Sequence, residues 1–248
     1  MLIAQLSDPH VRPDGVLYQG VADSNAQFAA AIAALNGLDP RPDLVLLSGD
    51  LVDNGTLPEY ARLRELLRGL EIPLLVIPGN HDDRDAFRSA FRDHDYLPDT
   101  GPMHYAVGTH GAVDAAGARW LDETLAREPA RPTIVMMHQP PFETGVPYLD
   151  LYACRGGQRL AAVVSRHRQV ERIVCGHVHR FMLLRFGGTL LCTAPSTTTA
   201  IALQLRPDAR PASHLEPPAF LLHHWRPGVG LITHFVPIGA FPGPYPFA

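Results

Sequence analysis

The sequence contains no lysine: all 21 of its basic residues are arginine, against 25 acidic residues, which gives a net charge of −4 with neutral histidine. A mildly acidic chain has no general field that attracts polyanions. We therefore expect no nucleic-acid polymer among its partners. The sequence also lacks any apolar stretch approaching the roughly 20 residues of a membrane-spanning helix, so we expect no membrane partner.

Cysteine is scarce as well, with three residues, Cys154, Cys175 and Cys192. An odd number without a C-x-x-C pair argues against a disulfide framework and against a zinc site built from thiolates. The first residues reach Asp8 after only a few apolar side chains and carry no cationic segment, so they do not resemble a secretion signal. These absences predict a cytoplasmic location.

Short apolar runs alternate with amphipathic segments in the first third of the chain. We predict strands over 2–6, 44–47 and 74–77, and helices over 21–35 and 58–70, where apolar residues repeat at helical spacing. The strands are apolar at every position rather than at alternate ones, which is typical of a sheet covered on both faces. This order predicts an α/β fold.

The later part of the chain again alternates strands with a helix and then continues with antiparallel hairpins. A helix over 157–167 lies between predicted strands over 133–137 and 171–175, and two hairpins follow, formed by 181–186 with 190–193 and by 220–225 with 231–236. We therefore predict two packed sheets flanked by helices in one domain, residues 1–248. Residues 195–248 are expected to supply the C-terminal strands and a cap or oligomerisation segment.

Five of the predicted strands end in polar side chains. They are followed by Ser7-Asp8-Pro9-His10, Ser48-Gly49-Asp50, Gly79-Asn80-His81-Asp82, His138-Gln139 and Gly176-His177-Val178-His179. Each motif alone is typical of a turn or a helix cap. Ligands of open α/β sheets bind beyond the carboxyl ends of the strands, so five such motifs in one topological position favour a shared site.

The side chains of these motifs form a coherent set of metal donors. The candidate ligands are Asp8, His10, Asp50, Asn80, His138, His177 and His179. Carboxylate, amide and imidazole donors without a thiolate suit Mn, Fe, Co or Zn. The set is large enough for two adjacent divalent ions with Asp50 as a bridge. Such a pair, about 3.5 to 4 Å apart, would provide a hydroxide near neutral pH and bind phosphoryl oxygens during in-line displacement.

The order D-x-H, G-D, G-N-H-D, H and G-H-x-H resembles that of the calcineurin-like metallophosphoesterases. Within that family, two stretches are similar to bacterial glycerophosphodiesterases and class III cyclic-nucleotide phosphodiesterases. The first is the opening Leu6-Ser-Asp-Pro-His-Val11 with Leu17-Tyr18 and Asn25, and the second runs from His138-Gln-Pro-Pro through Asp150, Cys154, Gly157 and Arg159 to Cys175-Gly-His-Val-His179. The resemblance implies a four-layer α/β/β/α sandwich of two mixed sheets flanked by helices. It also makes a homo-oligomer, a dimer or larger, the expected assembly.

The resemblance further implies a role for each site residue. It assigns one ion to Asp8, His10, Asp50 and His179, and the other ion to Asp50, Asn80, His138 and His177. His81 is then not a ligand but contacts the phosphoryl oxygens or protonates the leaving group, which makes His81 and the bridging Asp50 the predicted catalytic residues. The sequence is shorter than the family pattern between Tyr105 and Trp120, where the family usually carries an extra strand. We therefore expect one sheet to lack a strand and the pocket wall to differ there.

The leading hypothesis is a dinuclear metal-dependent phosphodiesterase that uses a metal-bound hydroxide. Its candidate substrates are small phosphodiesters, either cyclic nucleotides or glycerophosphodiesters. A phosphomonoesterase of the same family is the alternative within the same chemistry. A non-catalytic scaffold with the same fold is a third reading, which the complete ligand set disfavours.

Overall fold

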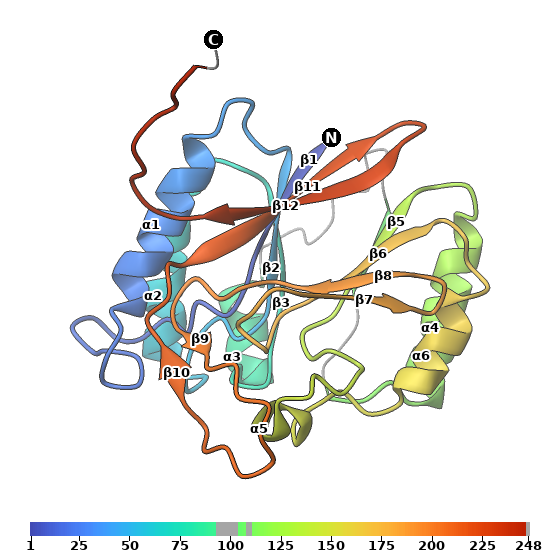
Figure 1. Ribbon diagram of the computed structural model, residues 1–248, viewed down its shortest axis with the longest axis horizontal. Coiled ribbons are helices and arrows are strands. Elements are labelled where there is room, and N and C mark those ends of the chain that lie inside the picture. The colour runs from blue at the N-terminus through green and yellow to red at the C-terminus, as the bar shows by residue number, and fades with distance from the viewer. Residues whose placement is uncertain (93–103, 108–110, 247–248) are drawn as a thin grey trace.

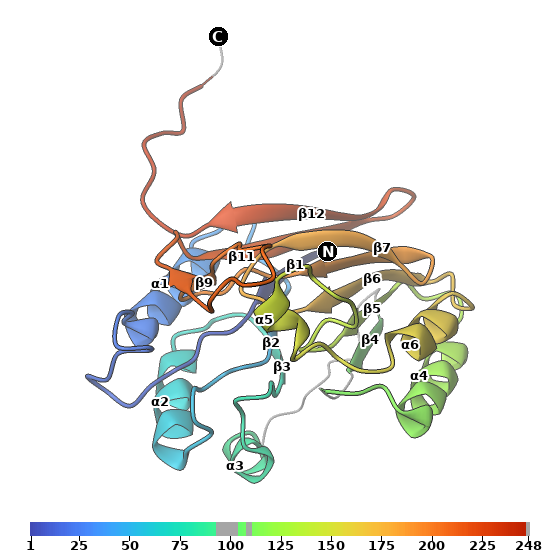
Figure 2. The ribbon, with the colours of Figure 1, turned by 60° about the horizontal axis from the view of Figure 1, so that its bottom comes forward.

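The computed structural model describes residues 1–92, 104–107 and 111–246, and it has two sheets packed face to face with helices on both outer sides (Figure 1). Figure 2 shows the same layers from another direction, with α1 and α2 on one side of the sheets and α4 and α6 on the other. Each sheet contains both parallel and antiparallel strand pairs. The predicted α/β/β/α sandwich of two mixed sheets is confirmed.

The first sheet combines strands from both ends of the chain. In spatial order its strands are β12 (Gly230–Pro237), β11 (Ala219–Arg226), β1 (Leu2–Leu6), β2 (Leu44–Ser48) and β3 (Leu74–Ile77). β1, β2 and β3 are parallel, whereas β11 runs antiparallel to both of its neighbours. The C-terminal hairpin therefore completes the sheet that the N-terminal strand begins.

Three helices pack on the outer face of this sheet: α1 (Ser24–Asn36), α2 (Leu57–Leu67) and α3 (Arg84–Ala90). Helix α1 begins later than predicted because the carboxylate of Asp23 accepts the backbone N–H of Ala26 and caps the helix. The carboxylate of Asp83 caps α3 in the same way. These caps fix the point at which each loop from the sheet edge returns to a helix.

The second sheet contains the middle part of the chain. In spatial order its strands are β4 (His104–Val107), β5 (Thr133–Met136), β6 (Val170–Cys175), β8 (Thr189–Thr193) and β7 (Met182–Phe186). β7 is antiparallel to β8, and the other pairs are parallel. Helices α4 (Ala115–Arg127) and α6 (Gly157–Val164) cover its outer face.

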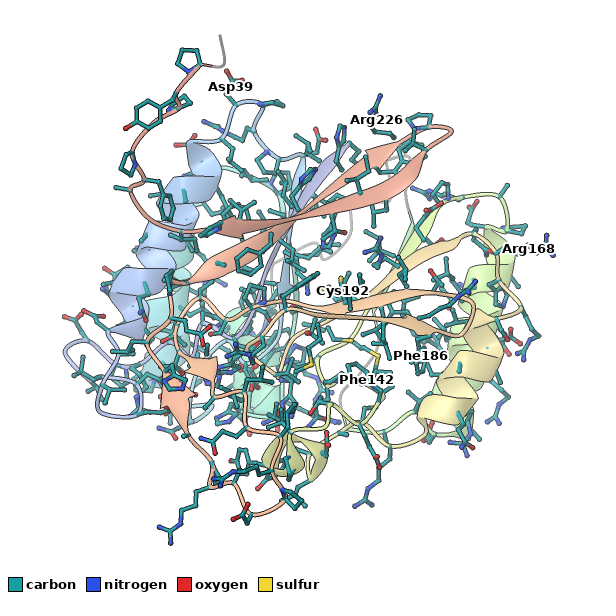
Figure 3. All side chains as sticks on the ribbon, viewed as in Figure 1. Asp39, Phe142, Arg168, Phe186, Cys192 and Arg226 are labelled. Atoms are coloured by element: carbon teal, nitrogen blue, oxygen red, sulfur yellow. The ribbon has the colours of Figure 1, made fainter. Side chains whose placement is uncertain are left out.

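Each strand divides its apolar side chains between two cores. On β2, Leu46 belongs to the core between the sheets, whereas Leu47 belongs to the core beneath α1 and α2. On β5, Ile134 likewise faces the other sheet and Val135 faces α4 and α6. Cys192 lies in the central layer between the sheets (Figure 3). Burial on both faces explains why these strands are apolar at every position.

Some elements were not predicted from the sequence. Helix α4, the short helix α5 (Pro147–Asp150) and the two-stranded sheet of β9 (Ala200–Ile201) with β10 (Ser213–His214) are additional. Part of the segment that is shorter than in the family, residues 108–110, lies outside the described residues, while β4 beside it pairs with β5. Among the described residues, no helix combines the length and the apolar character needed to cross a bilayer.

Candidate metal centre

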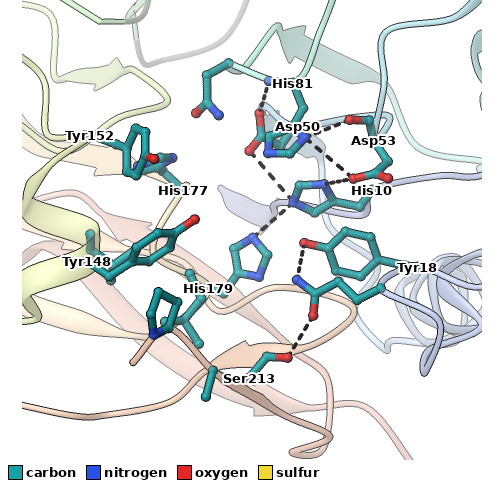
Figure 4. A pocket seen from close by; sticks show the side chains of 16 residues that line it. His10, Tyr18, Asp50, Asp53, His81, Tyr148, Tyr152, His177, His179 and Ser213 are labelled. Carbon is teal, nitrogen blue, oxygen red and sulfur yellow. Dashed lines mark hydrogen bonds and ion pairs between the residues drawn. The ribbon is translucent and has the colours of Figure 1, made fainter. Parts of the chain in front are cut away.

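The predicted ligands follow strands that end at one edge of the sandwich. Backbone hydrogen bonds hold the loops after neighbouring strands together: Asp8 N donates to the Gly49 carbonyl at 3.1 Å, and Gly176 N donates to the His138 carbonyl at 2.9 Å. The second of these bonds joins the loops after β5 and β6. All seven predicted ligand residues are consequently brought to one place. Figure 4 shows four of them, His10, Asp50, His177 and His179, around the pocket.

Asp8, His10 and His179 form the first cluster, with one donor atom from each within 4.8 Å of the others, and all three residues are buried. The Nδ1 atom of His179 lies 2.8 Å from the carbonyl oxygen of Thr199 and donates to it. The lone pair of His179 is therefore on Nε2, which lies 3.5 Å from Asp8 Oδ1 and 3.1 Å from His10 Nε2. This orientation directs three electron-rich atoms at one point.

Asp50, His138 and His177 form the second cluster, and their donor atoms also lie within 4.8 Å of one another. His138 Nδ1 lies 2.8 Å from the Ser48 carbonyl oxygen, which leaves Nε2 facing Asp50 Oδ1 at 3.2 Å and Asn80 Oδ1 at 3.2 Å. Burial opposes the imidazolium form of His138, yet Asp50 raises the pKa of this histidine to about 9. The cluster therefore favours a cation at this point, and a divalent ion there would replace the proton.

His177 supplies the clearest sign that a further group belongs in the second cluster. Its Nε2 atom is buried and has no hydrogen-bond partner among the described residues. Burial and the neighbouring His138 lower the pKa of His177 to about 3, so the ring is neutral and keeps a free lone pair. A buried nitrogen without a partner is costly. A metal ion between Asp50, His138 and His177 would satisfy it.

Asp50 connects the two clusters. Its Oδ1 atom faces His138, while its Oδ2 atom lies 3.7 Å from His10 Nε2 in the first cluster. The carboxylate is nearly fully buried, and it accepts the backbone N–H of His81 at 2.9 Å. One residue thus presents an oxygen to each cluster, which is the arrangement that a ligand shared by two ions requires.

The backbone at the strand ends adopts the left-handed region. Six described residues other than glycine have positive φ, and five of them are predicted ligands: Asp8 (51°), His10 (43°), Asp50 (48°), His177 (70°) and His179 (53°). Such conformations are sparsely populated for residues with a side chain and gather at functional sites. The backbone at the strand ends is therefore held in an energetically unfavourable conformation that directs these side chains into the site.

Three glycines beside the ligands leave no room for a side chain. A Cβ atom on Gly49 would overlap the His138 ring, one on Gly79 would overlap the Asp50 carboxylate, and one on Gly176 would overlap the Ser7 hydroxyl. These glycines directly precede Asp50, Asn80 and His177. Their small size lets neighbouring loops approach closely enough to form the two clusters.

His81 stands beside the clusters and contacts Asp53. Its Nδ1 atom donates to the Asp53 carbonyl oxygen at 2.7 Å and lies 3.5 Å from the Asp53 carboxylate. Hydrogen bonding to Asp53 raises the pKa of His81 to about 9 against the effect of burial. The carboxylate of Asp53 also lies 3.6 Å from His10 Nδ1 and 2.7 Å from Arg12 Nη1. Asp53 therefore orients His81, while its carboxylate faces His10 without a hydrogen bond.

Asp53 was not predicted from the sequence, although its place in the loop of Asp50 pointed to the site. It follows Asp50 by three residues in the same loop, where Val52 pairs with Val11 from the loop after β1. His10, Asp53 and His81 also have donor atoms within 4.8 Å of one another. Arg12 pairs with Asp53, His81 donates to the Asp53 carbonyl, and His10 Nδ1 faces the Asp53 carboxylate. This group therefore supports the metal clusters from beside them.

Comparison with known proteins agrees with this geometry. Residues 1–181 match the family model described as calcineurin-like phosphoesterase. The chain belongs to the calcineurin-like phosphoesterase family. This calcineurin-like phosphoesterase is 32% identical to a probable glycerophosphodiester phosphodiesterase from Arcobacter nitrofigilis, with 100% of this chain and 97% of the relative covered.

Two further comparisons place this calcineurin-like phosphoesterase among its relatives. A 3′,5′-cyclic-nucleotide phosphodiesterase from Nostoc is 30% identical, with 72% of this chain and 71% of the relative covered. The solved structure of a dimetal phosphatase from Danio rerio matches with a TM-score of 0.64 at 12% identity, over 96% of this chain and 99% of that chain. At that identity the structural match shows the fold alone.

A pocket of about 620 Å³ opens onto both clusters of this calcineurin-like phosphoesterase (Figure 4). Beyond the ligands, His81 and Asp53, it is lined by Tyr18, Gln19, Tyr148, Leu149, Tyr152, Ile201, Pro211, Ala212 and Ser213. None of the residues lining the pocket in the described part of the chain is an arginine. The outer wall therefore combines aromatic, apolar and neutral polar side chains. Tyr18 stands in a quoted motif, and Tyr148, Leu149 and Tyr152 lie within the quoted run from His138 to His179, but none of them was singled out as a site residue from the sequence.

Proposed function

We propose that this protein is a dinuclear metal-dependent phosphodiesterase that hydrolyses small phosphodiesters. The observation that carries the proposal is the pair of buried donor clusters joined by Asp50 at the base of an open pocket. Bound divalent ions would supply positive charge for the phosphoryl oxygens and lower the pKa of a bound water. The named relatives act on phosphodiesters, which supports the same reaction type here.

Each ion of the proposed pair has its own ligands, and Asp50 is common to both. We assign the first ion to Asp8, His10, Asp50 and His179 and the second to Asp50, Asn80, His138 and His177. The facing lone pairs of His179 and His138 support this division, because each is directed at the oxygen of a different cluster. Histidine, carboxylate and amide donors suit Mn, Fe, Co or Zn.

His81 is the proposed general acid or phosphoryl contact. Its Nδ1 atom donates to the Asp53 carbonyl, so Nε2 is the ring atom that remains for the substrate. The ring also lines the pocket. When the bond between phosphorus and the leaving oxygen breaks, a proton on Nε2 would pass to that oxygen, and an alcohol would leave.

The wall of the pocket favours a diester over a monoester. A phosphomonoester carries a second negative charge near neutral pH, and no arginine lines this pocket among the described residues. The uncharged outer wall instead offers space for a second ester group. A phosphomonoesterase remains the alternative, and the comparison of p-nitrophenyl phosphate with bis(p-nitrophenyl) phosphate decides between them. Faster turnover of the monoester would reverse the order of the two proposals.

Metal analysis tests the function as a whole. The protein is stripped with a chelator, reconstituted with Mn²⁺ or Co²⁺, and assayed for bound metal and for hydrolysis of bis(p-nitrophenyl) phosphate. We expect two ions per chain and turnover that depends on them. Fewer than one ion per chain together with no hydrolysis would mean that the chain is a scaffold with this fold.

The physiological substrate, location and assembly are separate proposals. Cyclic nucleotides and glycerophosphodiesters are both candidates, and a panel of cAMP, cGMP, glycerophosphocholine and glycerophosphoethanolamine ranks them.

Three buried free cysteines support a reducing, cytoplasmic setting. Exposed aromatic side chains near the C-terminus, including Phe241 and Tyr245, support a homo-oligomer, which sedimentation analysis tests.

A further inference from the structure

The outer wall of the pocket contains two tyrosines that the chemistry at the metal clusters does not use. Tyr148 and Tyr152 are 38% and 49% exposed, although tyrosine rings generally gain from burial. Both line the pocket, and Figure 4 shows them on the side opposite Tyr18, with the hydroxyl of Tyr148 directed into the cavity. Exposed rings that face a catalytic pocket are available to a substrate.

The two rings form a fixed corner. Their centroids are 5.4 Å apart, and their planes meet at 66°. Edge-to-face contact of this kind stabilises the relative orientation of two aromatic rings. The pair therefore presents a rigid surface of two ring planes at an angle.

The segment that carries the tyrosines is anchored by the turn before α5 and by buried side chains of α5 and the residue before it. The carboxylate of Asp150 accepts hydrogen bonds from Thr144 N at 2.6 Å and from Gly145 N at 3.0 Å, which fixes the preceding turn. Val146 and Leu149 are buried against Val178. Val178 lies between the predicted ligands His177 and His179. Its packing against Val146 and Leu149 therefore fixes the position of the two tyrosines relative to the metal clusters.

The opposite wall is also fixed and uncharged. Ser213 Oγ lies 2.7 Å from Gln19 Oε1, and Gln19 Nε2 donates to the Tyr18 hydroxyl at 3.1 Å. This link joins loops far apart in the sequence and closes the side of the pocket that faces Tyr148 (Figure 4). A group between the two walls meets aromatic faces and neutral polar atoms, and the charged side chains that line the pocket lie at its base, in the clusters and at His81 and Asp53.

We infer that Tyr148 and Tyr152 determine substrate specificity by holding an organic group of the phosphodiester against their rings, and that they select a flat, uncharged ring over an acyclic group. The inference rests on the proposed phosphodiesterase function. The metal clusters bind the phosphoryl group common to all candidates. The tyrosine corner is the part of the pocket that distinguishes one ester group from another.

Binding of two simple diesters to the reconstituted protein tests the inference without depending on turnover. Diphenyl phosphate and diethyl phosphate carry the same charge, but only the first has rings. Titration calorimetry gives a Kd for each, and we expect the wild type to prefer diphenyl phosphate. Each substitution, Tyr148→Ala or Tyr152→Ala, should lower that preference by about 2- to 10-fold, because one ring contact is lost.

Matched variants distinguish a ring contact from other effects. Tyr148→Phe keeps the ring and should keep the preference, and Tyr245→Ala removes an exposed tyrosine outside the pocket and should change neither Kd. An unchanged preference in both alanine variants, or an equal loss in Tyr148→Phe, would overturn the inference. Absence of hydrolysis with intact diester binding would instead count against the proposed function alone.

Discussion

Gly79 lies so close to Asp50 that a Cβ atom on Gly79 would overlap Oδ1 of the shared carboxylate. The same position would also overlap the backbone nitrogen of Asp50, which cannot move without shifting the loop after β2. The glycine therefore determines where the carboxylate of Asp50, the proposed bridge, stands. Its effect should be visible in metal binding rather than in the pocket wall.

The variant Gly79→Ala should lose affinity for both ions. Displacement of Asp50 removes a donor from each cluster, and we expect metal affinity to fall about 10-fold or more. Measurement of bound metal after dialysis at graded Mn²⁺ concentrations gives the result. Gly37→Ala is the matched control, because Gly37 has negative φ and only ordinary contacts around an added Cβ. Wild-type affinity in Gly79→Ala would contradict the role given to Asp50.

Neighbouring residues in one motif should respond differently to truncation. Asn80→Ala removes an oxygen that lies 3.2 Å from His138 Nε2, so one of the two ions should be held more weakly. His81→Ala removes a ring that donates to the Asp53 carbonyl, so both ions should remain while turnover falls by about 10²- to 10⁴-fold. Metal content and kcat are measured on both variants. Loss of both ions in His81→Ala would show that the histidine is a ligand.

Removal of metal should lower thermal stability as well as activity. The clusters hold buried carboxylates and imidazoles with left-handed backbone, and bound ions would offset the cost of both. At a metal concentration of 100 times Kd, binding contributes about 2.7 kcal/mol. For a chain of this size that corresponds to a rise in Tm of roughly 5–10 °C. Scanning calorimetry with chelator and with Mn²⁺ measures it, and equal Tm values would contradict the prediction.

Acid should destabilise the fold through His223, which lies between the sheets. Its Nε2 is 3.2 Å from Gln5 Oε1, and burial together with the charge of Arg172 lowers its pKa to about 3. In the unfolded chain His223 has a pKa near 6.5. Between about pH 6.5 and 3 this histidine is therefore protonated in the unfolded chain but not in the folded one. Stability present above pH 6.5 is lost as the pH falls through this window, by about 2 kcal/mol at pH 5.

Urea unfolding of the chelated protein at pH 7.5 and pH 5 measures this loss. His223→Gln should show a smaller difference between the two pH values, because the titrating ring is absent. His224→Gln, at the next position on β11, is the matched control and should behave like the wild type. The same pH dependence in His223→Gln and in the wild type would assign the effect to other groups.

The strands and the ligand loops were predictable because their physical causes are local. Apolar runs buried on both faces identify β1, β2 and β3, and polar residues directly after them, such as Asp8 and Asp50, mark the sheet edge. Asp53 was missed because a carboxylate in a loop is typical of a turn until His10 and His81 are seen beside it. Its role depends on loops that meet only in the fold.

The wall of the pocket was not predictable for the same reason. Helix α5 spans only Pro147–Asp150, and its position depends on packing against Val178 from a distant loop. Helix α4 was missed because Gly117 and the alanines of its first turns give no clear apolar repeat, while Leu121 and Leu125 are buried against the second sheet. Tertiary contacts, which sequence spacing does not contain, decide both elements.

Val178 has a consequence for how the protein can be altered. Its side chain supports the segment that carries Tyr148, while its backbone connects one ligand of each proposed ion, His177 and His179. A larger side chain at Val146 or Leu149 would therefore press on Val178 and on the loop that holds both histidines. We therefore expect substitutions that reshape the tyrosine side of the pocket to change metal affinity as well, through their contact with Val178.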